Sequence, residues 1–363
     1  MKKFNFLTML FTALLMCAPL ASCSNDDDEG NGNGNGGGSA SNAPSTNTPL
    51  INEGRLLLTK VNVIGNDGEI DRSINMEYDS NRRAHRCYGI YNYDNESQNI
   101  FVIDYANGKI NLYEDEFAGA DISFNSNGYI TKLKVTWDET EDGVRYYGSE
   151  DISFTYSQDG HLTEVNIIGE DHGNEQESGK EITKTTYTWD NGNLISEREY
   201  TTWYNEDGSI DEIDEDVIEY TYGEQGNRFK QYTAGISDIN DAPFFVIGMC
   251  GVGPAMLPTG RKHTYKYTEG GSTHEGVSSH TSYTYTLNEN GSINTETETS
   301  SYNYSLTYAY GYTSSDSYTP TKATASNAVQ TRTTAVSNVM RTRALLKSLP
   351  FVPQRKSKQD KAL

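Results

Sequence analysis

A short turn motif recurs along this chain and limits what it can fold into. The motif reads Asn or Asp, then Gly, then any residue, then Ile or Leu, and it occurs seven times. Asn and Asp tolerate the left-handed backbone conformation and Gly adopts it freely, so these dipeptides are strong signals for tight hairpin turns. The copies begin at Asp67, Asn107, Asn127, Asp159, Asn191, Asp207 and Asn290. The sequence therefore predicts a series of antiparallel hairpins.

Between these turns, aromatic and apolar residues alternate with Ser, Thr, Glu and Lys, as in Phe154-x-Tyr156, Tyr187-x-Trp189 and Tyr308-x-Tyr310-x-Tyr312. Successive side chains of a strand point to opposite faces, so this pattern predicts one buried face and one wet face. No long stretch of helical periodicity interrupts residues 55–315. The expected fold class is all-β: a long antiparallel meander of repeated hairpins, forming a strongly curved sheet or a barrel. The pattern leaves open sheet and closed barrel as alternatives.

One apolar segment, residues 240–259, breaks the alternation and contains Pro243, Pro254 and Pro258. Proline is not tolerated in a central strand, so the segment reads as an insertion. We expect it to fill the core, lying over an opening of the sheet or plugging one end of a barrel, and it leaves room for a short helix. Lining a ligand pocket is the alternative.

The N-terminus has the layout of a secretory signal peptide: Lys2 and Lys3 precede an apolar stretch that ends in Leu20-Ala21-Ser22-Cys23. This ending resembles the lipobox of bacterial lipoproteins, in which the cysteine carries the lipid. We therefore predict a signal peptide over 1–22 and lipidation at Cys23. A permanent membrane helix is the competing interpretation, but about 17 apolar residues ending in a lipobox fit a cleaved segment better.

Residues 23–50 contain an acidic run followed by Gly, Asn, Ser and Thr, with few apolar side chains. Such a segment cannot bury enough surface to offset its ordering entropy, so it predicts a lipidated flexible tether. The acidic run resembles the export signal that sends Bacteroidetes lipoproteins to the outside of the outer membrane; a merely solvated linker is the alternative. The β domain is expected over 51–319.

Charge is distributed unevenly along the chain. The formal net charge is -22, which disfavours nucleic acid and an anionic membrane surface as partners. Residues 320–363 nevertheless carry nine basic side chains against the single acid Asp360. Because exposed ion pairs contribute little at physiological salt, we predict a basic, largely disordered tail.

Two cysteines remain once Cys17 leaves with the signal peptide and Cys23 is lipidated. These are Cys87 and Cys250, which are far apart in the sequence and show no metal-ligand spacing. The sequence leaves two alternatives: a disulfide between Cys87 and Cys250, or two separately buried thiols.

Recognisable catalytic and metal-binding motifs are absent from the sequence. It has no Gly-x-Ser-x-Gly, no His-Glu-x-x-His and no EF-hand calcium loop. The acids of residues 207–216 could bind a hard cation, although such a run is more often a solvated loop. The six histidines show no ligand spacing. We therefore predict no cofactor, no metal and no assignable catalytic residue.

Aromatic residues are the best candidates for a ligand site, because the chain has 26 tyrosines, three tryptophans and 11 phenylalanines. Exposed aromatic rings stack on sugars, and Trp189, Trp203 and Tyr204 are the candidate ligand-binding residues. Core packing is the alternative role for these rings.

The lipobox, the acidic tether, the hairpin meander and the proline-rich insertion together resemble a family of Bacteroidetes surface lipoproteins of unknown function with a porin-like antiparallel fold. The single turns also resemble the Tyr-Asp repeats of Rhs-type shell proteins, as in Tyr156-Ser157-Gln158-Asp159-Gly160. The resemblance covers about residues 55–315 and carries over no catalytic residue. It implies an envelope location, lipid-anchored in the outer membrane and facing the cell exterior.

The predicted function is that of a non-catalytic envelope lipoprotein. Its partners would be the membrane, through the lipid, and an extracellular glycan or an envelope protein. A structural scaffold without a small-molecule ligand, and a hydrolase without a recognisable motif, are the alternatives. An outer-membrane barrel needs an apolar outward face on every strand, whereas the outward positions here are mostly Thr, Ser, Glu and Lys.

Overall fold

The computed structural model describes residues 56–91, 97–112, 117–141, 144–172, 179–237, 243–269, 271–302 and 304–321. They form sixteen β-strands and two short helices, α1 (Ala234–Ser237) and α2 (Pro243–Val246). The strands are β1 (Leu56–Ile64), β2 (Ile70–Tyr78), β3 (Ala84–Tyr91), β4 (Ser97–Asp104), β5 (Lys109–Leu112), β6 (Phe117–Phe124), β7 (Ile130–Glu141), β8 (Val144–Tyr156), β9 (Leu162–His172), β10 (Gly179–Asp190), β11 (Asn193–Tyr204), β12 (Ile210–Gly226), β13 (Met256–Glu269), β14 (Ser272–Leu287), β15 (Ile293–Ser300) and β16 (Ser305–Ser314).

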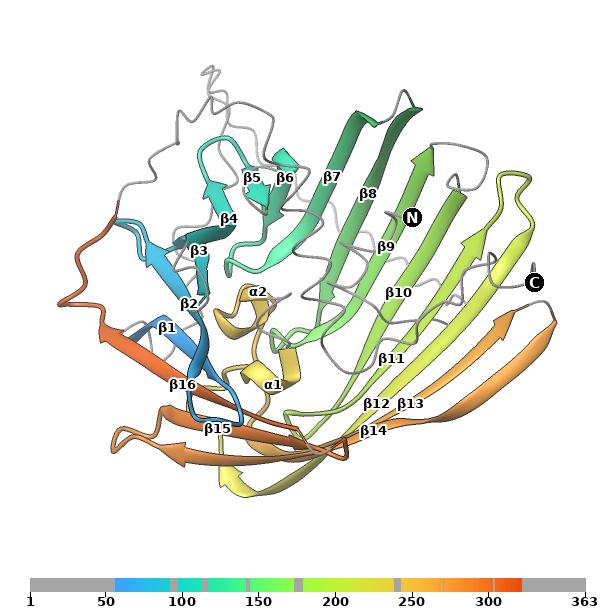
Figure 1. Cartoon of the computed structure of the whole chain (residues 1–363). Helices are drawn as coiled ribbons and strands as arrows, with labels where there is room; N and C mark the ends of the chain where they lie inside the picture. Colours follow the sequence, from blue (N-terminus) through green and yellow to red (C-terminus); the bar gives the residue numbers. More distant parts are fainter. Residues whose placement is uncertain are drawn as a thin grey trace, which may run out of the picture. The chain divides into compact units, whose positions relative to one another are not determined.

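The strands close into a barrel (Figure 1). Each strand pairs antiparallel with its neighbours in the sequence, and β1 pairs with β16, where Val61 lies opposite Tyr310. The predicted all-β antiparallel meander is confirmed. Of the two alternatives, open sheet and closed barrel, the structure has the closed barrel. Closure leaves no unpaired sheet edge among the described strands, which removes a site for aggregation.

The repeated Asn/Asp-Gly dipeptides form tight turns. Gly128, Gly160 and Gly192 have φ angles of 82°, 83° and 76°, as the motif predicts. In the first of these turns the amide of Gly128 donates to the carbonyl of Asn125 over 3.0 Å. Glycine tolerates this left-handed backbone without the strain that a Cβ atom brings, so each turn reverses the chain in a few residues.

The two faces of the barrel wall differ in chemistry. On β7, Leu133 and Val135 are buried in the interior, whereas the alternate positions Lys132, Lys134 and Thr136 face outward. Ion pairs join neighbouring strands on the outside: Lys134 to Asp151 at 2.5 Å, Lys184 to Glu164 at 2.7 Å and Lys180 to Glu170 at 2.9 Å. Exposed pairs of this kind contribute about 0–1 kcal/mol each, so the interior, not the outer wall, holds the fold together.

Tyrosines fill much of the interior. The rings of Tyr187, Tyr220, Tyr283, Tyr308 and Tyr310 are all buried. Their hydroxyl groups find polar partners: Tyr310 donates to Glu296 at 2.6 Å, and Tyr220 donates to Glu197 at 2.5 Å. At these positions the alternating aromatic residues of the sequence therefore pack in the core.

The apolar insertion between β12 and β13 closes one end of the barrel. Its helices α1 and α2 lie inside the ring of strands (Figure 1). Phe244 stacks on Phe101 of β4 with ring centroids 5.0 Å apart. Three backbone hydrogen bonds fasten the segment to three consecutive turns at that end, from Ile130 to Met249, from Val252 to Gly160 and from Ala255 to Gly192. The structure contains the predicted plug at a barrel end, and we call residues 227–237 and 243–255 the plug. The expected end of the insertion at residue 259 is wrong: residues 256–259 belong to β13, where Pro258 pairs with Tyr222 at an irregularity of the ladder that accommodates a residue without an amide hydrogen. Residues 240–242 of the predicted insertion lie outside the described residues.

A buried carboxylate holds the first plug helix. Glu296 of β15 is fully buried and accepts hydrogen bonds from the amides of Ala234 and Gly235 at 3.0 and 3.2 Å. Burial raises the pKa of Glu296, and the hydrogen bond from Tyr310 opposes that shift. The plug is therefore anchored by polar contacts as well as by apolar packing.

Both remaining cysteines are free and buried, Cys87 on β3 and Cys250 in the plug. Burial raises the pKa of Cys87 to about 12, which keeps the thiol protonated and unreactive at neutral pH. Of the two alternatives that the sequence left open, the structure contains the separate thiols.

The described part of the chain ends at Thr321. Its amide donates to the carbonyl of Tyr78 over 3.1 Å, so the ordered contacts run two residues beyond the expected boundary at 319. Within the described ranges no helix is long and apolar enough to cross a membrane. The predicted signal peptide, Cys23, the tether and the tail from residue 322 lie outside the described residues.

Candidate functional site

The three aromatic residues expected to bind a ligand are separated by the fold. Trp189 lies at the plugged end, where its indole donates to the carbonyl of Leu162 over 2.7 Å and its ring stacks on His161 with centroids 4.1 Å apart. Because His161 also lies against the plug, 2.9 Å from the carbonyl of Val252, this cluster packs the plug onto the wall. The surroundings of Trp189 are those of a core residue.

Trp203 and Tyr204 are adjacent on β11 and therefore face opposite sides of the wall. Trp203 points inward and donates to Glu181 over 3.1 Å. Tyr204 points outward and lines a surface hollow. The structure thus brings only Tyr204 of the three to an accessible depression in the outer wall.

Two hollows lie side by side on the outer wall, toward the barrel end opposite the plug. The first, of about 590 Å³, extends over β7, β8 and β9. The second, of about 670 Å³, extends over β9, β10 and β11. Glu170 and His172 line both, so the two hollows adjoin at β9. We call the combined depression the trough.

Strand register builds the floor of the trough. Thr136 lies opposite Ser149, Ser149 opposite Glu170, Glu170 opposite Lys180, and Lys180 opposite Tyr204. All five are outward positions of successive strands from β7 to β11, so their side chains form one row across the wall. Two hydroxyl groups, one ion pair and one aromatic ring follow each other along this row.

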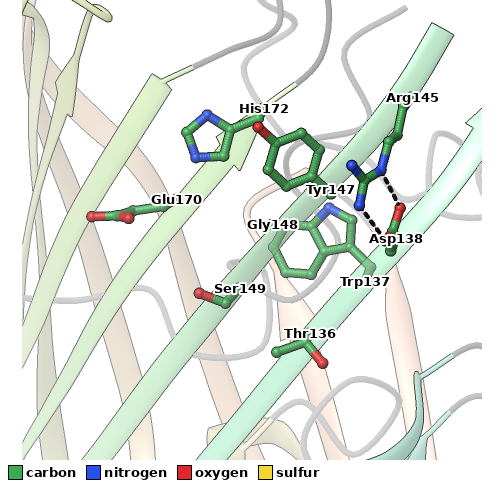
Figure 2. A pocket seen from close by; sticks show the side chains of 9 residues that line it. All are labelled: Thr136, Trp137, Asp138, Arg145, Tyr147, Gly148, Ser149, Glu170 and His172. Atoms are coloured by element: carbon green, nitrogen blue, oxygen red, sulfur yellow. Dashed lines mark hydrogen bonds and ion pairs between the residues drawn. The ribbon is translucent and has the colours of Figure 1, made fainter.

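An aromatic pair borders the first hollow (Figure 2). Tyr147 of β8 lies directly opposite His172 of β9, and their rings stack with centroids 4.8 Å apart. The guanidinium of Arg145 lies 4.7 Å from the centroid of the Tyr147 ring and also binds Asp138 with two hydrogen bonds, of 2.8 and 2.6 Å. Tyr147 is 42% exposed, so its ring is presented to solvent although its neighbours fix its orientation.

Charges in the trough are paired. The hydrogen bonds from Arg145 lower the pKa of Asp138, and the hydrogen bond from Lys180 lowers the pKa of Glu170. Both carboxylates are therefore ionised at neutral pH, and each lies beside a cation. Because these two pairs cancel, the trough offers polar hydrogen-bonding groups, and Glu206 of the second hollow adds one negative charge.

The acidic run of residues 207–216 does not form one site. Asp207 lies in the turn before β12, where it accepts the amide of Ser209. Along β12 the acids then alternate: Glu215 faces outward and pairs with Arg198, whereas Asp216 faces inward and lies 2.6 Å from His263. In the ranges that the structure describes, no group of three or more His, Cys, Asp or Glu side chains is arranged to hold a metal ion.

His263 and Asp216 form the pair that most resembles acid–base machinery. Ser279 of β14 lies opposite His263 in the sheet and is the obvious nucleophile to test. Among the hydrogen bonds of the described residues none joins Ser279 to His263, although Nε2 of His263 contacts Asp216. The pair lacks the nucleophile contact that a serine hydrolase requires.

Sequence reasoning missed Tyr147 and His172. The two residues are 25 positions apart and become neighbours only through the pairing of β8 with β9. One sequence signal could have found them. The Asp159-Gly160 turn sets the register of the two strands that it joins, so counting residues away from the turn along both strands brings Tyr147 opposite His172.

Two solved structures align with this chain at low identity. A porin-like protein from Bacteroides vulgatus aligns with a TM-score of 0.40 and 15% identity, covering 71% of this chain and 98% of that one. A porin-like protein from Bacteroides uniformis aligns with a TM-score of 0.28 and 10% identity, covering 75% of this chain and 100% of that one. No family model matches the chain, and no curated protein matches it. Its resemblance to the surface lipoprotein family therefore stays a prediction.

Proposed function

We propose that this chain is a non-catalytic outer-membrane lipoprotein, anchored through Cys23 and facing the cell exterior, whose barrel binds an extracellular glycan on its outer wall. The trough over β7–β11 carries this proposal. It combines solvent-exposed aromatic rings with hydroxyl groups and hydrogen-bonded charges, which is the chemistry that recognises sugar rings and their hydroxyls.

The polarity of the wall supports an anchor outside the barrel. Charged side chains face outward on strand after strand, as Lys134, Lys184 and Lys262 do with their acidic partners. A lipid-facing strand with Lys at mid-membrane costs roughly 2–4 kcal/mol per residue. The barrel is therefore expected to stand in water, with the lipid on Cys23 as its attachment.

A scaffold role is the second candidate. The observation that favours it is the burial of Tyr187, Tyr220 and Tyr283, whose rings pack the interior of the barrel. A scaffold of this kind would need no ligand, and Tyr147 and Tyr204 would then serve only to cover the wall.

Glycan binding separates the two candidates. The full chain, purified in a mild detergent, is applied to an array of bacterial, plant and host glycans, and the Tyr147→Ala variant is run beside it. Tyr302→Ala is the matched control, because Tyr302 is also 42% exposed and lies in the turn between β15 and β16. Binding that Tyr147→Ala weakens and Tyr302→Ala leaves unchanged supports the proposal. The absence of binding to every glycan rejects it in favour of the scaffold.

A further inference from the structure

We propose that the trough takes a neutral oligosaccharide of about four sugar units, lying across the strands from β7 to β11. This inference rests on the proposed glycan binding and adds the length, the charge and the direction of the ligand. Two separate sugar sites, one in each hollow, would be the simpler arrangement, and the geometry argues against it.

The floor of the trough is continuous from the first hollow to the second. The two hollows share Glu170 and His172, and no outward side chain of the row from Thr136 to Tyr204 is missing from their lining. At the junction Glu170 and Lys180 are hydrogen-bonded at 2.9 Å, so their side chains lie against each other along the floor. An oligosaccharide bound in the first hollow can therefore extend into the second, because the two hollows adjoin at β9.

The length of the trough sets the length of the ligand. Five adjacent strands span four inter-strand spacings, or roughly 19 Å, which is the length of about four linked pyranose rings. The row of paired side chains runs perpendicular to the strands, so the ligand lies across the barrel wall and not along one strand.

The order of groups along the trough suits a chain of sugars. At the β8–β9 side, the stacked rings of Tyr147 and His172 offer an apolar edge to one sugar face. At the β11 side, Tyr204 does the same beside Ile182, which also lines the second hollow. Between them, Glu170 accepts and Lys180 donates hydrogen bonds, a combination that matches vicinal sugar hydroxyls.

Charge balance decides for a neutral chain. Arg145 and Lys180 are the Arg and Lys side chains among the described lining residues, and each is bound to a carboxylate, Asp138 and Glu170 respectively, so neither is left to pair with a uronate or a sulfate. Glu206 adds a further negative charge to the lining of the second hollow. An acidic sugar would have to displace an existing ion pair, which costs affinity.

The test is a calorimetric titration of the full chain in mild detergent with oligosaccharides of two to six units. The neutral probes are β-1,4-glucose, β-1,4-xylose, β-1,4-mannose and α-1,4-glucose oligomers, and oligogalacturonate of four units is the charged comparison. The variants are Tyr147→Ala in the first hollow, Tyr204→Ala in the second and Glu170→Gln at the junction, with Tyr302→Ala as the control. Thermal unfolding of each variant verifies that it is folded.

For at least one neutral series, we expect affinity to rise by about tenfold or more from two to four units and to level off beyond four. Tyr147→Ala and Tyr204→Ala each reduce the affinity for the four-unit ligand to about that for two units, and Glu170→Gln weakens every length. Oligogalacturonate of four units binds at least about tenfold more weakly than the four-unit oligomer of that neutral series.

Affinity that does not depend on length, sensitivity to only one of the two tyrosines, or tighter binding of oligogalacturonate would overturn the inference. Each of these results leaves glycan binding, and with it the proposed function, in place. The absence of binding by all neutral probes and by oligogalacturonate overturns both.

Discussion

Two glycine substitutions measure how firmly the plug is seated. Gly251 of the plug and Gly208 of the turn before β12 have similar left-handed φ angles, 95° and 80°. Their surroundings differ: a Cβ atom at Gly251 would lie 2.5 Å from the carbonyl oxygen of Gly160, whereas one at Gly208 would meet nothing within 4 Å. Alanine therefore introduces backbone strain at both positions but a steric clash at only one.

The expected loss of stability follows from these contacts. Alanine in the left-handed region costs about 1–2 kcal/mol at either position. At Gly251 the clash also pushes the plug away from the turn, which breaks the hydrogen bond of 2.9 Å from Val252 to Gly160 and disturbs the contact with Tyr156. A lost hydrogen bond and disturbed packing add about 2 kcal/mol, so Gly251→Ala should cost roughly 3–4 kcal/mol.

Urea unfolding of the full chain, followed by tyrosine and tryptophan fluorescence, measures both variants against the wild type. We expect a loss of unfolding free energy that is at least about 1.5 kcal/mol larger for Gly251→Ala than for Gly208→Ala. Equal losses would refute the reasoning, because the plug would then contribute nothing through its contact with the turn between β8 and β9.

Three further predictions concern the anchor, the buried carboxylate and the tail. Cys23→Ser should release the protein from the membrane fraction, because the lipid is the one attachment expected; unchanged fractionation after ultracentrifugation would reject the assignment. Burial raises the pKa of Glu296 above its unfolded value, so its contribution to stability is complete below about pH 4.3 and is lost as the pH rises through the folded pKa. The unfolding free energy of Glu296→Gln, relative to that of the wild type, should therefore increase with pH in a series of denaturant titrations. A difference that does not change with pH would contradict this. Deleting residues 322–363 should leave the melting temperature unchanged, whereas ending the chain before Tyr318, which accepts the amide of Tyr78 over 2.9 Å, should lower it; a large shift in the first deletion would show that the tail belongs to the fold.

Local sequence signals were enough to predict the class of fold. The Asn/Asp-Gly turns and the period-two alternation act over a few residues, and the turns at Gly128, Gly160 and Gly192 follow them. The disruption of the alternation by proline likewise predicted the plug. These features are encoded where they occur, so the sequence of a single chain reveals them.

Closure of the sheet and assembly of the trough could not be predicted in this way. The pairing of Val61 with Tyr310 joins the two ends of the meander, and nothing near either residue specifies the other. The trough depends on the registers of four strand pairs in succession, and the outward or inward direction of Trp203 and Tyr204 depends on that register too. For the same reason Trp189 could not be assigned to the core from its sequence context alone.

The claim that the barrel stands in water, with its polar wall outward, can be tested directly by sedimentation. The chain from residue 24 onward, without signal peptide or lipid, is purified with no detergent and then examined with and without added detergent. We expect a folded, monodisperse protein in buffer, rich in β-structure by circular dichroism, that binds no detergent when detergent is supplied. Aggregation in buffer, together with a bound detergent belt around the β-rich protein, would contradict it, because such a belt forms only where the outer wall is apolar.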